Sequence, residues 1–253
     1  MKKWMVLCLC LVGLLSACGQ NREPAAEDFT VPDGMVSMPC RVMEMENTRM
    51  VLAELEGSPA GVYTAVLGDA VVKYEDPART EVKAGDLVEV IFRGDIMETY
   101  PAQLGDISQL WVRGEGFDDR HVRYLELFEE FVREDPALAD DITQCGLDLS
   151  RTALTPAEQS AVAWMLEPKL GVPVMNATWE ELAQQGYINR EELYWEDGVF
   201  FSVTEKDSSA TSLTFDAQMW RSGLGAQYFC DCTSSRTANG PWSEVTVGAV
   251  AVS

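Results

Sequence analysis

Apolar and polar residues are arranged differently along four stretches of the chain. Two lysines and an apolar run come first, and the polar segment 18–35 shows no apolar period. Short apolar runs broken by turn residues fill 36–115, and helical periods mixed with short runs fill 117–253. This pattern predicts a signal peptide over 1–17, a flexible tether over 18–35, and two folded domains, 36–115 and 117–253.

The stretch 36–115 is typical of short β-strands. Its apolar runs are rich in β-branched residues and are separated by Gly, Pro, Asn and Asp, which favour turns. The runs are MPCRVMEME, RMVLAEL, GVYTAVL, DAVVKY, GDLVEVIF and DISQLWVR. Short strands in a small domain predict a β-barrel, closed or partly open, because closure removes exposed strand edges.

Helices are predicted early in the second domain. The run DRHVRYLELFEEFVRE carries apolar residues at helical spacing and predicts an amphipathic helix. Three capping boxes, TPAE from Thr155, TWEE from Thr178 and NREE from Asn189, predict three more helix starts. In such a box the Thr or Asn side chain and the Glu three residues later satisfy free backbone N–H groups.

Strands make up most of the remaining chain, in the runs CGLDLS, VPVMN, SLTFDAQMW, GAQYFCDCTS and SEVTVGAVAV. Asp197 and Gly198 lie between the apolar arms of LYWEDGVFFSV and predict a hairpin turn. This order of elements predicts an α+β domain whose helices pack on one face of a largely antiparallel sheet. The predicted fold class is therefore mainly β plus α+β, with a small OB-like barrel first.

The first twenty residues contain the parts of a secretory signal. Lys2 and Lys3 precede an apolar run that is shorter than the roughly 20 residues of a membrane-spanning helix, and the run ends in LSAC. This ending resembles the lipobox of bacterial lipoproteins. The resemblance implies attachment of diacylglycerol to Cys18, removal of 1–17, and a lipid anchor on the outer face of the cytoplasmic membrane. The alternative is an uncleaved membrane helix with an incidental cysteine.

Two further resemblances cover parts of the folded chain. GDLVEV with IMETYPAQLGDI resembles a small OB-like β-barrel domain of unknown function found in Gram-positive lipoproteins. Pro101 cannot donate a backbone hydrogen bond, so the strand is interrupted beside a polar and aromatic cluster. Glu98, Tyr100 and Gln103 are therefore candidate ligand contacts, and the alternative is a turn that satisfies its own polar groups. FDAQMWRSGLGAQYFCDC resembles a module of uncharacterised lipoproteins and transfers no site.

The chain is strongly acidic, with 41 acidic and 19 basic side chains and a formal charge of -22. Removal of 1–17 would leave 17 basic side chains and a charge of -24. Binding to nucleic acid requires clustered Lys and Arg, so nucleic acid is excluded as a partner. The expected partners are the membrane, through the lipid, and an extracytoplasmic protein or small ligand.

No catalytic or metal-binding residue can be assigned, and no cofactor is expected. His121 is the only histidine, and no nucleophile motif accompanies it, so a packing role is expected. The sequence contains no zinc motif of the H-E-x-x-H type, P-loop, dinucleotide fingerprint or EF-hand loop. Carboxylates are too numerous to select a glycosidase pair. Most tryptophans stand beside apolar residues and are expected in the core.

The cysteines leave two alternatives open. Besides Cys18, the mature chain would contain Cys40, Cys145, Cys230 and Cys232 in a compartment that permits disulfides. Cys230 and Cys232 are two apart, so on a regular strand they share one face and do not bridge each other. A bridge from Cys145 to Cys230 or Cys232 is one possibility, and buried free thiols are the other.

Two functions from different classes remain. One is a non-catalytic, membrane-anchored lipoprotein that binds a partner or ligand outside the membrane. The other is an extracytoplasmic hydrolase that uses carboxylates. Binding is favoured because the sequence lacks recognisable nucleophile and metal motifs, although it carries the features of an anchor, a tether and two compact domains.

Overall fold

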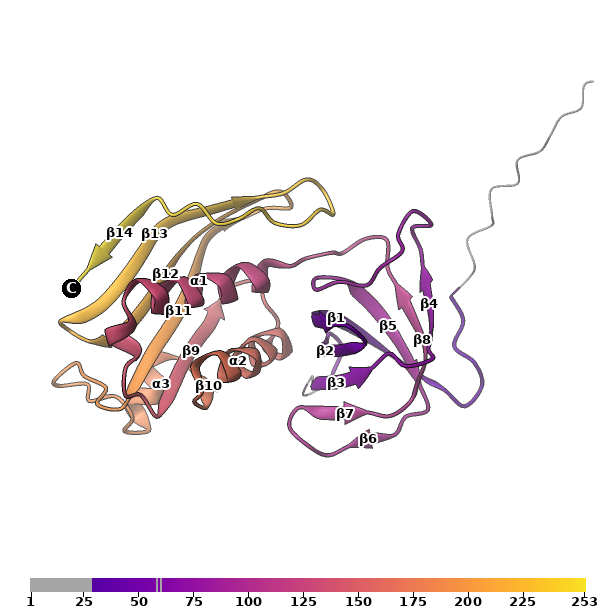
Figure 1. The fold of residues 1–253 in the computed structure, drawn as a ribbon, viewed down its shortest axis with the longest axis horizontal. Helices are drawn as coiled ribbons and strands as arrows, with labels where there is room; N and C mark the ends of the chain where they lie inside the picture. The colour runs from indigo at the N-terminus through magenta and orange to yellow at the C-terminus, as the bar shows by residue number, and fades with distance from the viewer. Residues whose placement is uncertain (1–28, 58, 60) are drawn as a thin grey trace, which may run out of the picture.

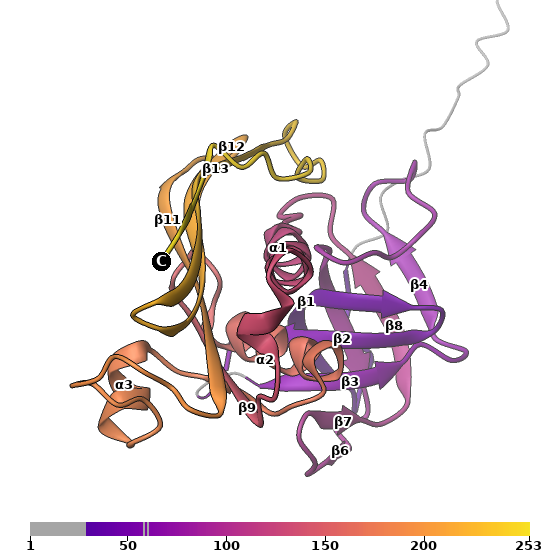
Figure 2. The ribbon, with the colours of Figure 1, turned by 60° about the vertical axis from the view of Figure 1, so that its left-hand side comes forward.

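The computed structural model of the protein describes residues 29–57, 59 and 61–253, which form three layers. A curled β-sheet forms the first layer, two helices form the second, and another β-sheet forms the third (Figures 1 and 2). The helices are α1 (Arg120–Glu134) and α2 (Pro156–Leu170), and both lie between the sheets. The prediction for Cys18 falls outside the described residues.

The first sheet has eight strands, which include the six predicted before residue 115 and two short strands, β6 and β7, on either side of Pro101. They are β1 (Val36–Glu46), β2 (Arg49–Glu54), β3 (Val62–Val66), β4 (Val71–Tyr74), β5 (Leu87–Phe92), β6 (Ile96–Met97), β7 (Ala102–Leu104) and β8 (Ile107–Val112). Their order in the sheet is β4-β8-β5-β1-β2-β3-β7-β6. The sheet is mixed, because β4 pairs in parallel with β8 and β3 with β7.

The prediction of an OB-like barrel is wrong for the part of the chain that the structure describes. There, no ladder joins the edge strands β4 and β6, so the first sheet stays open. The interruption predicted at Pro101 is confirmed, because β6, with two residues, ends before it and β7, with three, begins after it. Proline cannot donate to a ladder, so the interruption leaves only a short edge strand. The broader prediction of a mainly β fold is confirmed.

The curled sheet has an apolar core of its own. Met50 and Leu52 on β2 point into this core, which also contains Val88 and Leu110. The alternate β2 residue Val51 points to the other side, toward the helices. Both faces of the central strands are therefore buried, which explains why β2 has a continuous apolar run from Met50 to Ala53.

The second sheet follows the predicted α+β order. Its strands are β9 (Gln144–Arg151), β10 (Val174–Asn176), β11 (Gly198–Ser208), β12 (Ser212–Ser222), β13 (Gly225–Ser235) and β14 (Ala249–Val252). The order is β10-β9-β11-β12-β13-β14. β9 pairs in parallel with β10 and β11, and the remaining ladders are antiparallel. A short 3-10 helix, η1 (Pro136–Ala139), precedes β9.

The prediction that helices cover only one face of this sheet is wrong. Helices α1 and α2 cover one face, and α3 (Trp179–Gln184) packs on the other. Leu182 of α3 joins a small apolar cluster with Phe200 and Trp220, whose strand neighbours Phe201 and Met219 belong to the main core. Alternation along β11 and β12 thus buries both faces of the sheet.

Two local predictions fail for reasons of packing. Asp197 and Gly198 form no hairpin; Gly198 begins β11 beside the Trp195 indole, where a Cβ atom would lie 2.0 Å from Trp195 Cε2. Asn189 begins no helix. Its Oδ1 accepts hydrogen bonds from the backbone N–H groups of Glu191 and Glu192, and the chain then turns back into a bridge between Asn189 and Tyr194.

The other two capping boxes are confirmed. In α2 the Thr155 hydroxyl accepts from the Glu158 N–H at 3.3 Å, and Glu158 Oε2 accepts from the Thr155 N–H at 2.7 Å. The helix ends at Gly171 in the left-handed conformation, which glycine adopts without strain. In α3, Thr178 and Glu181 make the same reciprocal pair. Local sequence therefore determines where these helices begin.

A buried ion pair joins the first sheet to α2. Arg41 Nε on β1 lies 3.0 Å from Glu158 Oε1, and the two side chains are 14% and 7% exposed. Arg41 also donates to the carbonyl oxygen of Gly85 at 3.1 Å. Removing one partner of such a pair leaves an uncompensated buried charge, at a cost of about 3–5 kcal/mol. The capping carboxylate of α2 therefore also holds the first sheet.

His121 makes a second connection between the two sequence halves. Its ring is 1% exposed, and Nε2 donates a hydrogen bond to the backbone oxygen of Met43 on β1 at 2.8 Å. The structure thus places this side chain in the core, between α1 and β1. The division into two domains near residues 115–117 stays a prediction, because the first half has a core of its own but its Val51 and Val62 also belong to the core around the helices.

We predict that protonation of His121 destabilises the fold. Burial lowers the pKa of His121 despite the hydrogen bond to Met43. The stabilisation of the fold by neutral His121 is therefore fully present above the unfolded pKa of about 6.5. It is lost as the pH falls toward the lower pKa of the folded state. Over this range the free energy of unfolding should fall by up to about 1.4 kcal/mol per pH unit. Urea unfolding of residues 29–253 at a series of pH values measures it.

His121→Gln is the matched control, because glutamine keeps an N–H donor and does not titrate. Its unfolding free energy should lack the histidine-dependent slope just below pH 6.5. Equal slopes in this range for both proteins would contradict the prediction.

Candidate functional site

A groove lies where the first sheet faces α2. It has a volume of about 390 Å³. Its walls come from β1, β2, β3, β7 and α2, so residues far apart in the sequence meet there. The lining residues are Glu44, Glu46, Arg49, Met50, Val51, Thr64, Ala65, Val66, Gln103 and Trp164. We call this space the inter-layer groove.

Strand pairing positions the polar side chains of the inter-layer groove. Glu44 and Glu46 are two apart on β1, after an irregularity between Val42 and Glu44, and both line the groove. Arg49 on β2 is the register partner of Glu46. Gln103 on β7 is the register partner of Thr64 on β3. The sheet therefore presents two carboxylates, a guanidinium, an amide and a hydroxyl to one space.

Trp164 supplies the opposite wall. It lies on α2, half-buried, and packs against the main apolar core with part of its indole. The remaining part faces the groove. An aromatic face opposite several hydrogen-bonding side chains is the arrangement that small polar ligands with apolar C–H faces use.

The three predicted contact residues are only partly brought together. Gln103 lines the inter-layer groove, whereas Glu98 and Tyr100 are exposed in the β6–β7 hairpin and are not part of its lining. Tyr100 is 71% exposed. Partial burial and the negative charge of Glu167 on α2 raise the pKa of Tyr100.

Some polar groups of the hairpin form hydrogen bonds within the hairpin itself. Thr99 Oγ1 donates to the carbonyl oxygen of Pro101 at 2.7 Å, and the Thr99 N–H donates to the oxygen of Met97 at 2.9 Å. The two alternatives from the sequence therefore apply to different residues. Thr99 makes its hydrogen bonds within the turn, whereas Gln103 lines the inter-layer groove.

Sequence reasoning missed Trp164, Glu44, Glu46, Arg49 and Thr64. Four of the six tryptophans expected in the mature chain are buried, as predicted: Trp111, Trp195, Trp220 and Trp242. Nothing in the sequence distinguishes Trp164 from these, because α2 is apolar around most of its circumference. The inter-layer groove forms only when the first sheet packs against α2, so no single stretch of sequence indicates it.

The cysteines of the described chain are all free thiols. Cys145 lies on β9, and Cys232 lies on β13, three strands away. Strand spacings of about 4.8 Å separate them by roughly 14 Å, beyond the Cα separation of about 7 Å that a disulfide tolerates. Burial raises the pKa of the Cys145 thiol, and burial and nearby carboxylates raise that of Cys232 to about 12.

A β-bulge corrects the expectation that Cys230 and Cys232 share one face. Asp231 has a φ of 51°, and its N–H bonds to Asp216 Oδ1 at 2.8 Å. The extra residue shifts the alternation, so Phe229 and Cys232 are both buried and Cys230 is half-exposed.

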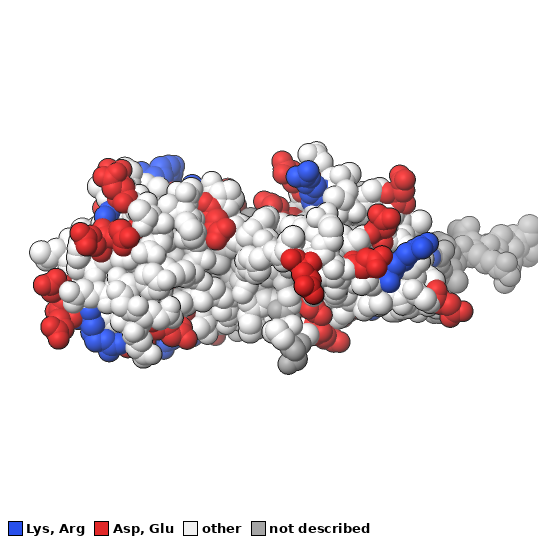
Figure 3. Space-filling model, turned by 90° about the horizontal axis from the view of Figure 1, so that it is seen from below, with Lys and Arg blue, Asp and Glu red and all other residues white. Residues whose placement is uncertain are grey.

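The excess of acidic over basic residues in the sequence is visible on the face of the molecule in Figure 3. Figure 3 shows acidic side chains spread over the face seen there, with fewer basic ones among them. Within residues 29–57, 59 and 61–253, no helix is long and apolar enough to cross a bilayer. The same residues contain no group of three or more His, Cys, Asp or Glu side chains arranged to hold a metal ion.

The sequence matches no protein-family model, and no curated protein matches it significantly.

Proposed function

We propose that this protein is a lipid-anchored extracytoplasmic lipoprotein that binds a small polar ligand of the saccharide class in the inter-layer groove. The observation that carries the proposal is the pairing of the Trp164 indole with the polar side chains of Glu44, Glu46, Arg49 and Gln103 around one space. A volume of about 390 Å³ lies within the range of small-molecule sites.

The chemistry of a saccharide suits both walls. The C–H face of a sugar ring packs on an indole, and its hydroxyls donate to carboxylates and accept from an amide or guanidinium. Glu98 and Tyr100, in the hairpin that leads into Gln103, would extend the contact surface beyond the groove. The acidic surface disfavours anionic ligands and supports a neutral or amino sugar.

The hydrolase alternative finds less support in this groove. Glu44 and Glu46 are exposed and project from the same strand. Glycosidases place their two carboxyl groups on either side of the scissile bond, in positions that give them different environments. Two neighbouring exposed acids on one wall fit hydrogen bonding to hydroxyls better than catalysis.

The position of the first described residues agrees with an anchor. The Phe29 ring packs edge-on against Trp111, with centroids 5.7 Å apart, and the Arg113 guanidinium lies over it at 4.9 Å. The chain thus enters the body beside β8, at the end of the molecule away from the second sheet (Figure 1). An anchor at Cys18 would hold the body by that end.

We predict that the groove variants lose saccharide binding. Titration of residues 29–253 with a panel of neutral and amino-sugar oligosaccharides, followed by NMR, identifies a ligand. Trp164→Ala should weaken that ligand about tenfold or more, which is about 1.4 kcal/mol, because the stacking face is removed. Gln103→Ala should weaken it less, and Tyr100→Ala least.

Trp179→Ala is the matched control. Trp179 is also a half-buried tryptophan, but it packs edge-on against Trp220 on the far face of the second sheet, with centroids 5.9 Å apart. This variant should bind the ligand like the wild type. Equal losses in both tryptophan variants, or no binding by any sugar of the panel, would reject the proposed ligand class.

We predict that the mature protein starts at an acylated Cys18. The protein extracted from bacterial membranes with detergent should have the intact mass of 18–253 plus acyl groups, because two acyl chains give stable anchoring. Cys18→Ala should remain unmodified and should not partition with the membrane through a lipid. An intact mass that includes Met1, or a free Cys18 thiol, would refute the anchor.

A further inference from the structure

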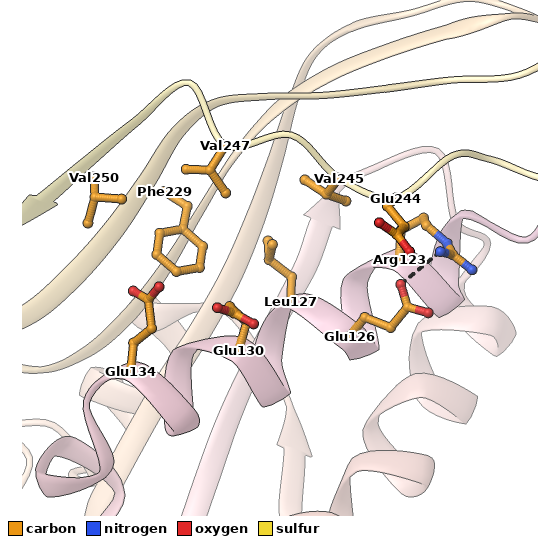
Figure 4. A pocket seen from close by; sticks show the side chains of 10 residues that line it. All are labelled: Arg123, Glu126, Leu127, Glu130, Glu134, Phe229, Glu244, Val245, Val247 and Val250. Atoms are coloured by element: carbon orange, nitrogen blue, oxygen red, sulfur yellow. Dashed lines mark ion pairs between the residues drawn. The ribbon is translucent and has the colours of Figure 1, made fainter.

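A second groove, distinct from the inter-layer groove, lies between α1 and residues 244–253, which we call the C-terminal segment. Its volume is about 330 Å³. The floor is apolar, with Leu127 from α1, Phe229 from β13, and Val245, Val247 and Val250 from the C-terminal segment (Figure 4). We call it the C-terminal groove.

The wall on α1 is acidic. Glu126, Glu130 and Glu134 repeat every four residues, so they form one row along the helix, and Glu244 faces them from the C-terminal segment (Figure 4). Arg123 is the one basic residue of the lining, and it pairs with Glu126 at 2.9 Å. Glu130 pairs with Arg133 of α1, which lies outside the lining, and Glu134 Oε2 accepts a hydrogen bond from Gln227 Nε2 at 2.6 Å. Four glutamates against two arginines still leave this groove with an excess of negative charge, and like charges at this spacing repel one another.

The strand beside the groove has an open edge. β14 ends the second sheet within the described chain. Ala226 and Ser253 exchange both backbone hydrogen bonds, so by antiparallel alternation Ala251 and Ala249 also bond to β13. The backbone groups of Val250 and Val252 then point away from the sheet, and these residues are 55% and 74% exposed. Such an edge can accept another strand.

We propose that the C-terminal groove binds an extended cationic segment of a protein partner, which adds to β14 as a further strand. Charge complementarity selects the occupant, because the wall offers four glutamates and the floor offers apolar surface for Lys or Arg stems. The spacing of the glutamates along α1 also matches the spacing of side chains on one face of a β-strand. Four helical residues rise about 6 Å, and two strand residues rise about 6.8 Å. A segment with Lys or Arg at every second position would place one cation beside each glutamate of the row.

The test uses two peptides of equal composition. One is Lys-Thr-Lys-Thr-Lys-Thr-Lys, and the other is Lys-Lys-Lys-Lys-Thr-Thr-Thr, in which an added strand cannot direct all lysines to one side. Fluorescence anisotropy with residues 29–253 at physiological ionic strength should show binding of the alternating peptide about tenfold tighter than the block peptide. Equal affinities would mean unspecific attraction to an acidic protein and would overturn the proposal.

Charge-reversal variants locate the site. Glu130→Lys and Glu134→Lys should each weaken the alternating peptide about tenfold. Glu191→Lys makes the same change in net charge at an exposed position outside the C-terminal groove and should bind like the wild type. Equal weakening by all three variants would show that net charge alone drives binding.

Variants of Val250 test strand addition. Val250→Pro removes an N–H that points away from β13, so the ladder to β13 is retained while a donor to the added strand is lost. Val250→Ala keeps that N–H. The proline variant should bind the alternating peptide several-fold more weakly than the alanine variant, with circular dichroism confirming that both are folded. Equal binding by the two folded variants would overturn strand addition.

Discussion

The rest of this structure depends on the burial of α2 between two sheets. Its residues Ala161 and Val162 lie in the same apolar core as Val51 and Val62 of the first sheet and Phe201 of the second. A helix that is covered on both sides must be apolar around most of its circumference, and the sequence of α2 has this pattern. Burial on both sides joins the two sequence halves and creates the groove along one margin of the helix.

Polar contacts set the position of this middle layer. Glu158 completes the capping box of α2 and also neutralises Arg41 from the first sheet, while His121 connects α1 to the Met43 backbone. Apolar burial alone leaves many packings close in energy, whereas a buried pair with one acceptable partner selects among them. We infer that these contacts fix how Trp164 faces Gln103, and therefore fix the shape of the inter-layer groove.

Much of the fold could be predicted because its signals are local. The strands before residue 115, the amphipathic α1 and the capping boxes at Thr155 and Thr178 depend on near neighbours in sequence. The failures depend on distant ones. Gly198 does not form a hairpin turn but leaves space for the Trp195 indole. The first sheet stays open because β6 at its edge is short.

The candidate site was harder to predict. Gln103 could be proposed because Pro101 interrupts a strand beside it, but Trp164 resembles the core tryptophans in its local sequence. Four strands and a helix meet at the groove, and their register alone decides which polar residues face it. The bulge at Asp231 makes the same point, since one extra residue places Cys230 and Cys232 on opposite faces of the strand.

The most direct test of this account is hydrogen exchange of the backbone amides in residues 29–253. If α2 is held between both sheets, its central amides should exchange as slowly as those of β11 and β12, through unfolding of the whole second half. Exchange of the α2 amides that is orders of magnitude faster than that of β11 and β12 would show that the helix opens separately. That result would contradict the central place given to the helix layer.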